Sequence, residues 1–153
     1  MDKLSILSNV AEVKLRYSSR VKASDRAQIK CSQEANTLIR KFWEDDMEHI
    51  ESMKLILLNR SNRVLGIANI STGGSAGTIC DPKVVFQYAL KANASSFILV
   101  HNHPSGNLKS SRADENITDQ IKKAGKLLGI QLLDHLIITP HDGYLSMADE
   151  GLL

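Results

Sequence analysis

The sequence has few cysteines, prolines and aromatic residues. Among 153 residues there are two cysteines and three prolines, and aromatic residues make up 5%. Cys31 and Cys80 are far apart and belong to no CxxC pair, which excludes a cysteine zinc cluster and a disulfide framework. Two free thiols indicate a reducing compartment.

Long hydrophobic runs are also missing. No stretch approaches the length of a membrane span, and the N-terminus has no apolar segment of signal-peptide length. We therefore expect a cytoplasmic protein that has no membrane partner.

The sequence has no large excess of one charge. Its 19 basic and 17 acidic residues leave a net charge of +2, which gives no general reason to bind nucleic acid. One segment differs, because the stretch from Lys14 to Lys30 is rich in lysine and arginine and has Asp25 as its one acidic residue. A solvated strand face and loop explain it most simply, and a DNA-binding patch is the alternative.

The spacing of apolar residues predicts one α/β domain over residues 10–153, after a tail over residues 1–9. The expected order is β-α-β-β-α-β-α-β-β, which indicates a mixed sheet flanked by helices. The expected strands cover 11–18, 51–59, 63–71, 95–101, 130–139 and a short stretch after residue 143, and the helices open at Ser32, Asp81 and Ser111. Residues 71–78 are rich in glycine but lack the lysine of a phosphate-binding loop, so we expect a flexible loop beside a groove.

The most informative stretch is LVHNHPSGNLKSSRAD, residues 99–114. If the strand over 95–101 continues through residue 103, His101 and His103 leave the same face of the sheet. Pro104 cannot donate to a strand ladder, so pairing should stop there. The two histidines then lie at the carboxyl end of a strand, where open α/β sheets place their sites.

Ser111 and Asp114 lie three residues apart on the first turn of the next helix. The carboxylate could therefore join the two histidines, and two histidines and a carboxylate with a fourth position open to water form a catalytic zinc pattern. The alternatives are a helix cap with a favourable charge and two histidines in a loop. The letters HNH also suggest a nuclease, but in HNH nucleases those residues are spread through a ββα unit.

His101-x-His103-Pro104, followed by Ser111-x-x-Asp114, resembles the JAMM motif of the JAB/MPN metalloproteases, whose fold is cytidine-deaminase-like. The longer string HNHPSGNLKSSRAD resembles the RadC family within that superfamily, as do ESMKLILLNRSNRVLG, LLDHLIIT and DGYLSMADEGLL. The resemblance covers residue 10 to the end, and it departs at Ser110, where relatives usually have proline. Longer members carry an N-terminal helical domain that resembles a DNA-binding domain, for which these 153 residues leave no room.

The resemblance implies a site as well as a fold. It implies that His101, His103 and Asp114 bind Zn²⁺, and that Ser111 supports the oxyanion or the water. It also implies a glutamate as general base on an early strand. The family pattern matches Glu51, with Glu48 as the second choice, while Glu44 should lie on the preceding helix.

The implied activity is zinc-dependent hydrolysis of a peptide or isopeptide. Two other functions stay open: a binding module without activity, and an accessory protein that binds DNA or DNA-repair proteins. A homodimer through an exposed strand edge is also compatible with the pattern. We expect Asp134 and His135 to form a buried polar pair or to support the ligands, the former being favoured, and His49 and His141 to lie on the surface.

Overall fold

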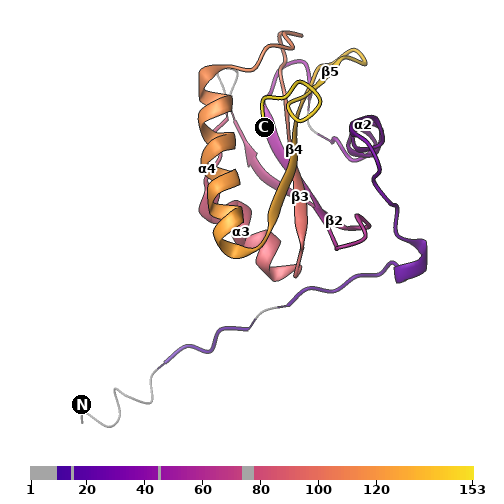
Figure 1. Ribbon diagram of the computed structural model, residues 1–153, viewed down its shortest axis with the longest axis vertical. Coiled ribbons are helices and arrows are strands. Elements are labelled where there is room, and N and C mark those ends of the chain that lie inside the picture. Colours follow the sequence, from indigo (N-terminus) through magenta and orange to yellow (C-terminus); the bar gives the residue numbers. More distant parts are fainter. Residues whose placement is uncertain (1–9, 15, 45, 74–77) are drawn as a thin grey trace.

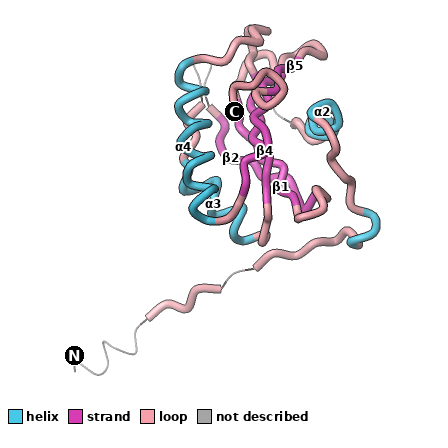
Figure 2. Tube along the Cα trace, in the orientation of Figure 1, coloured by secondary structure: helices cyan, strands magenta, loops and turns pink. Residues whose placement is uncertain are grey.

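The computed structural model describes residues 10–14, 16–44, 46–73 and 78–153. A five-stranded sheet in the order β2-β1-β3-β4-β5 has α3 and α4 on one face and α2 on the other (Figure 1). The strands are β1 (Ser52–Leu58), β2 (Val64–Thr72), β3 (Ser96–Asn102), β4 (Gln131–Ile138) and β5 (Tyr144–Ser146), and the helices are η1 (Ala23–Asp25), α2 (Ser32–Lys41), α3 (Pro82–Lys91) and α4 (Arg112–Leu128). Only β3 and β4 pair in parallel, so the sheet is mixed, as the sequence predicted. Figure 2 shows the strands, in magenta, between the helices α3 and α4 and the helix α2.

The central strands are buried on both faces. All seven residues of β1 and all seven of β3 are buried, which explains why both read as continuous apolar runs rather than alternating ones. Leu55 and Phe97 belong to the core beneath α3 and α4, whereas Ile56 and Ile98 belong to the core beneath α2. The two cores hold β1 and β3 between the helical layers.

Local signals set the ends of two helices. The Asp81 side chain accepts a hydrogen bond from the Lys83 amide and caps α3, and Ser111 caps α4. Gly129 ends α4 with a φ of 68°, a left-handed conformation that glycine adopts without a steric penalty. The sequence predicted the helix starts at Asp81 and Ser111 and the helix stop at Gly129 correctly.

The beginning of α2 differs from the prediction. Cys31 occupies the cap position, and Ser32 is the first helical residue. The Ser32 hydroxyl instead donates to Asp149 over 2.5 Å and so ties α2 to the C-terminal segment. Glu44 was expected on this helix, but the helix ends at Lys41, so Glu44 lies in the loop that follows.

The predicted strand over 11–18 is wrong for the residues that the structure describes there. Residues 10–14 and 16–22 are in no strand and are exposed, with Val13 at 88% exposure. A period-two pattern forms a strand only where a neighbouring edge offers hydrogen bonds. Residues 27–29 lie beside the start of β2 through the bridge of Gln28 with Arg63 and the bond from the Val64 amide to the Ala27 carbonyl. The chain before η1 contacts β2 through the Tyr17 hydroxyl, which donates to the Leu65 carbonyl, and not through a strand ladder (Figure 1).

Two expected segments fall wholly or partly outside the described residues. The glycine-rich loop was expected over 71–78, but its residues 74–77 lie outside the described part, and so does the tail over residues 1–9. Among the described helices none combines the length and the apolar character that a bilayer crossing requires.

A close approach between α4 and the start of β4 generates a stability prediction. A Cβ atom at Gly125 would overlap the carbonyl oxygen of Ile130, so Gly125→Ala should lower the free energy of unfolding by about 1–3 kcal/mol. Gly66→Ala is the control, because a Cβ atom there would meet nothing within 4 Å. Urea unfolding measures both, and equal stability of the two variants would contradict the prediction.

Candidate metal centre

His101 and His103 lie at the carboxyl end of β3. The strand ends at Asn102, but the His103 amide still donates to the carbonyl of Ile138 over 2.9 Å, so the extended course continues for one more residue. Both imidazoles therefore leave the same face, and their Nε2 atoms lie 2.9 Å apart. The predicted arrangement of the pair is present in the structure.

Asp114 reaches the same point from the first turn of α4. Its Oδ1 lies 3.2 Å from Nε2 of His101, and its Oδ2 lies 3.5 Å from Nε2 of His103. Asp114 and Ser111 also form a capping box, in which the Asp114 amide donates to the Ser111 hydroxyl and the Ser111 amide donates to the Asp114 carboxylate. The helix cap and the contact with the histidines, which the sequence presented as alternatives, exist together.

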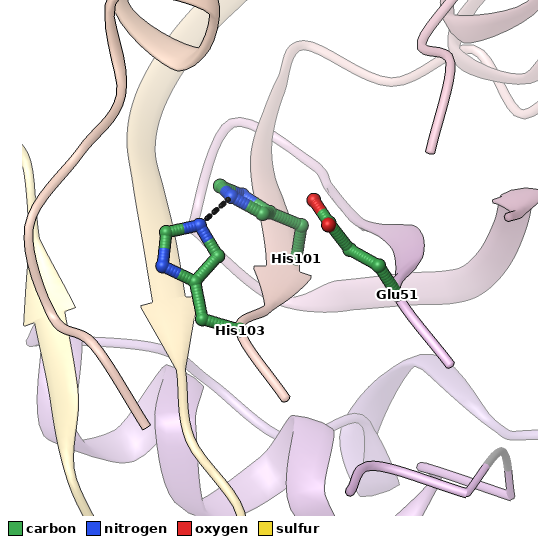
Figure 3. A group of neighbouring side chains, drawn as sticks. All are labelled: Glu51, His101 and His103. Carbon is green, nitrogen blue, oxygen red and sulfur yellow. Dashed lines mark hydrogen bonds between the residues drawn. The ribbon is translucent and has the colours of Figure 1, made fainter. Parts of the chain in front are cut away.

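Glu51 approaches from the other side, directly before β1. Ligand atoms of Glu51, His101 and His103 all lie within 4.8 Å of one another. Figure 3 shows the Glu51 carboxylate directed toward the imidazole pair from a separate segment. The antiparallel pairing of β1 with β3, in which Met53 faces His101, brings these residues together.

Asn102 holds the segment that carries Glu51, a role that the sequence analysis missed. The buried Asn102 side chain accepts from the Ser52 amide over 2.8 Å and donates to the carbonyls of Met47 and Ile50, each over 2.9 Å. These three bonds fix the chain on both sides of Glu51. The available signal was an amide side chain at the end of an otherwise apolar buried strand.

The other candidate acids and histidines lie away from this cluster. Glu48 is exposed and lies 4.0 Å from His141, which is itself exposed, so the structure brings Glu51 and not Glu48 to the imidazoles. His49 is exposed and contacts Asp46 over 2.8 Å. The surface positions expected for His49 and His141 are confirmed.

Asp134 and His135 have separate roles rather than forming one polar pair. The Asp134 carboxylate accepts from the amides of His135 and Ala148 and from the Ser146 hydroxyl, which fastens β4 to β5 and the turn after it. The His135 ring, fully buried, lies with Nε2 2.7 Å from Nδ1 of His101. The structural interpretation therefore holds for Asp134, while His135 touches the candidate site directly.

Thr118 completes this buried contact and was missed from the sequence. Its Oγ1 lies 2.6 Å from Nδ1 of His135 and 2.5 Å from the carbonyl oxygen of Asp114, one turn earlier in α4. A threonine on the inward face of an amphipathic helix was the available signal, since the neighbouring inward position is Ile121.

The electrostatics favour a charged carboxylate beside the imidazoles. Burial raises the pKa of the Asp114 carboxyl, but its close contacts with the His101 and His103 imidazoles outweigh this effect and hold that pKa well below its usual range. The same contact with Asp114 raises the pKa of His103, against the opposing effect of burial. Burial, reinforced by the neighbouring His101, holds the pKa of His135 well below its usual value, so this ring is neutral.

The spacing of these atoms suits a metal ion. Ligand atoms around a four-coordinate zinc ion lie roughly 3.3 Å apart, given Zn–N and Zn–O bonds of about 2.0–2.1 Å. The three separations among His101 Nε2, His103 Nε2 and the Asp114 oxygens, 2.9, 3.2 and 3.5 Å, fall on both sides of that value. These side chains could hold one cation, with the Glu51 carboxylate beside it.

An open hollow of about 520 Å³ lies against the cluster. It gives solvent-side access to Glu51 and His103, and the loop after β3 forms its wall. The remaining lining residues include Pro104, Ser105, Asn107 and Ser111. A reacting group of a substrate could therefore reach the cluster from this side.

Comparison with known proteins identifies the family. Residues 29–152 match the family model described as the RadC-like JAB domain. The chain belongs to this family. The mixed sheet and the arrangement of helices agree with a single JAB domain, as predicted from the sequence.

Curated relatives point to the same family. A protein of Clostridium kluyveri is 41% identical over 144 residues, which cover 94% of this chain and 61% of the relative. A protein of Flavobacterium johnsoniae is 49% identical over 102 residues, which cover 67% of this chain and 44% of the relative. Both bear the name UPF0758 protein, which states no reaction, and this chain spans 61% and 44% of their respective lengths.

The contact between His103 and Asp114 generates a pH prediction for the metal-free protein. Because the folded-state pKa of His103 is raised above 6.5, its protonation stabilises the fold below pH 6.5, and this stabilisation is lost as the pH rises through the raised pKa. A titration of the His103 ring by NMR should show the raised pKa. Asp114→Asn, which keeps an oxygen for the Ser111 amide but removes the charge, should lower the His103 pKa below its wild-type value, because Asp114 is the largest cause of the increase. A His103 pKa at or below 6.5 in the wild-type protein would contradict the prediction.

Proposed function

We propose that this RadC-like JAB domain is a zinc-dependent hydrolase that cleaves an amide bond in a peptide or an isopeptide. The observation that carries the proposal is the convergence of two imidazole nitrogens and a carboxylate at the spacing of zinc ligands, with a second carboxylate beside them. Under this proposal His101, His103 and Asp114 would hold the ion, beside the open hollow that Glu51 and His103 line. When bound, zinc lowers the pKa of water to about 7 and polarises a carbonyl group.

Glu51 is the general base in this proposal. Its carboxylate belongs to the same cluster as the imidazoles, and the Asn102 bonds hold its backbone in place. It would take a proton from the attacking water and deliver it to the nitrogen of the departing amine. The proton is thereby returned, and Glu51 ends the reaction in its starting state.

In this proposal Ser111 would stabilise negative charge on the substrate. Its oxygen accepts a hydrogen bond from the Asp114 amide. Its hydroxyl hydrogen makes no hydrogen bond to any of the described residues. Ser111 lines the hollow together with Glu51 and His103. It could donate to the carbonyl oxygen as that atom becomes an oxyanion.

DNA association is a second candidate function. Arg20 and Lys22 lie exposed on the extended segment before η1, where a phosphate backbone could reach them. No base-reading motif accompanies them, so amide hydrolysis is the better supported function. A role as a homodimer or as a partner of DNA-repair proteins stays a prediction.

His103→Ala should lose zinc without unfolding. His103 lies past the end of β3 and outside both apolar cores, so its removal deletes a ligand and leaves the packing intact. Elemental analysis should find about one zinc ion per wild-type chain and none in the variant, while circular dichroism stays unchanged. His141→Ala is the control, since that side chain is 91% exposed and remote from the cluster. Full zinc content in a folded His103→Ala protein would refute the site.

Glu51→Gln should keep zinc and lose hydrolysis by about 10²–10⁴-fold, because the amide cannot accept the proton. The assay uses fluorogenic peptides and peptides joined through a lysine ε-amino group, with Glu48→Gln as the matched control. Unchanged hydrolysis in Glu51→Gln would remove Glu51 as the base. Loss of zinc from this variant would instead make Glu51 a ligand.

A further inference from the structure

We infer that Thr118 and His135 are positioning residues, which fix His101 as the tautomer with its proton on Nδ1 and so present the bare Nε2 to the metal. The inference rests on the proposed zinc site for its purpose. Its structural content is a chain of hydrogen bonds that runs from α4 through β4 to β3. Once the donor of the first bond is known, the donor and the acceptor of each following bond are fixed.

The first bond is set by a backbone carbonyl. Thr118 Oγ1 lies 2.5 Å from the carbonyl oxygen of Asp114, which can only accept, and 3.6 Å from Met147 Sδ, which is a much weaker acceptor. The hydroxyl hydrogen is therefore used in this bond, a common arrangement for threonine within a helix. Toward His135 the same oxygen can only accept.

The second bond follows from the first. Nδ1 of His135 lies 2.6 Å from Thr118 Oγ1, so this nitrogen must carry a hydrogen. The ring is fully buried, and among the described residues no carboxylate bonds to it, so a charged form would be poorly compensated. A neutral ring with its hydrogen on Nδ1 has a lone pair on Nε2.

The third bond sets the tautomer of His101. Nδ1 of His101 lies 2.7 Å from Nε2 of His135. Because that Nε2 has a lone pair and no hydrogen, His101 donates from Nδ1. The neutral His101 ring then has a bare Nε2, the atom that lies 3.2 Å from Asp114 Oδ1. The second imidazole is oriented in a similar way, because His103 Nδ1 lies 2.6 Å from the carbonyl of Asn107 and must donate to it.

The result is a cluster of acceptors with no hydrogen among them when both rings are neutral. Two lone pairs and a carboxylate then face one another across 2.9 to 3.5 Å, an arrangement that needs a positive charge. In the metal-free protein a second proton on His103 can supply that charge. A metal ion supplies it without a proton and uses all three groups at once.

The chain of bonds also closes on itself. It begins at the Asp114 backbone carbonyl and ends at His101, whose Nε2 meets the Asp114 side chain. One ring of contacts thus ties β3, β4 and the first turns of α4 together. An outer partner of this kind typically changes metal affinity by about 10–100-fold when it is removed.

The test compares Thr118→Val with Thr118→Ser. Valine has nearly the shape of threonine but no hydroxyl, so His135 loses the reason to keep its hydrogen on Nδ1. His135 can then donate from its Nε2 to Nδ1 of His101. The neutral His101 ring would then carry its hydrogen on Nε2, and that nitrogen would no longer offer a lone pair to the metal. Serine keeps the hydroxyl and serves as the matched control.

Two readouts decide the matter. The ¹⁵N chemical shifts of the His101 ring in the metal-free protein report which nitrogen carries the hydrogen. Competition with a chelator gives the zinc affinity. We expect the Nδ1 tautomer in the wild-type protein and in Thr118→Ser, and in Thr118→Val a mixture of tautomers with zinc binding weakened about 10–100-fold.

Three results would overturn the inference. They are a hydrogen on His101 Nε2 in the wild-type protein, an unchanged tautomer and affinity in Thr118→Val, and equal weakening in the valine and serine variants. A purely structural role of Thr118 would lower the free energy of unfolding and leave the tautomer alone. If the wild-type protein binds no zinc, the proposed function fails, and the His101 tautomer of the metal-free protein still decides whether the hydrogen-bond chain acts as described.

Discussion

The pairing of β1 with β3 is the constraint on which the candidate site depends. Because the two strands are antiparallel, the start of β1 lies beside the end of β3, and Met53 faces His101. Glu51 and His101 are fifty residues apart in the sequence, yet this register leaves no other place for the glutamate. A shift by one residue would turn every side chain of β1 to the opposite face, and the apolar layers on both faces of β1 oppose such a shift.

The parallel pairing of β3 with β4 brings the remaining residues of the candidate site to His101. It carries the chain through α4 and back, so the first turn of α4 lies over the end of β3 and His135 lies beside His101. Asp114 can then cap its helix and face the imidazoles with one carboxylate. The site is thus assembled from three elements whose positions are fixed by packing rather than by the site itself.

Much of this arrangement could be predicted from the sequence because the signals are local. The two histidines before Pro104, the cap at Ser111 and the stop at Gly129 each depend on neighbouring residues, and the structure shows them as expected. The roles of Thr118, Asn102 and His135 depend on contacts 17 to 55 residues away, which no local pattern encodes. The strand expected over 11–18 failed for a related reason, since a period-two pattern cannot say whether a sheet edge is free to receive it.

The double use of Asp114 has a consequence for how members of the family can diverge. A relative that no longer binds a metal would still need an acceptor at this position to begin α4, whereas nothing in the core demands an imidazole at His103. Selection for folding alone would therefore preserve the aspartate and release the histidine. The position of His103, rather than that of Asp114, is therefore the better guide to which relatives retain the candidate metal centre.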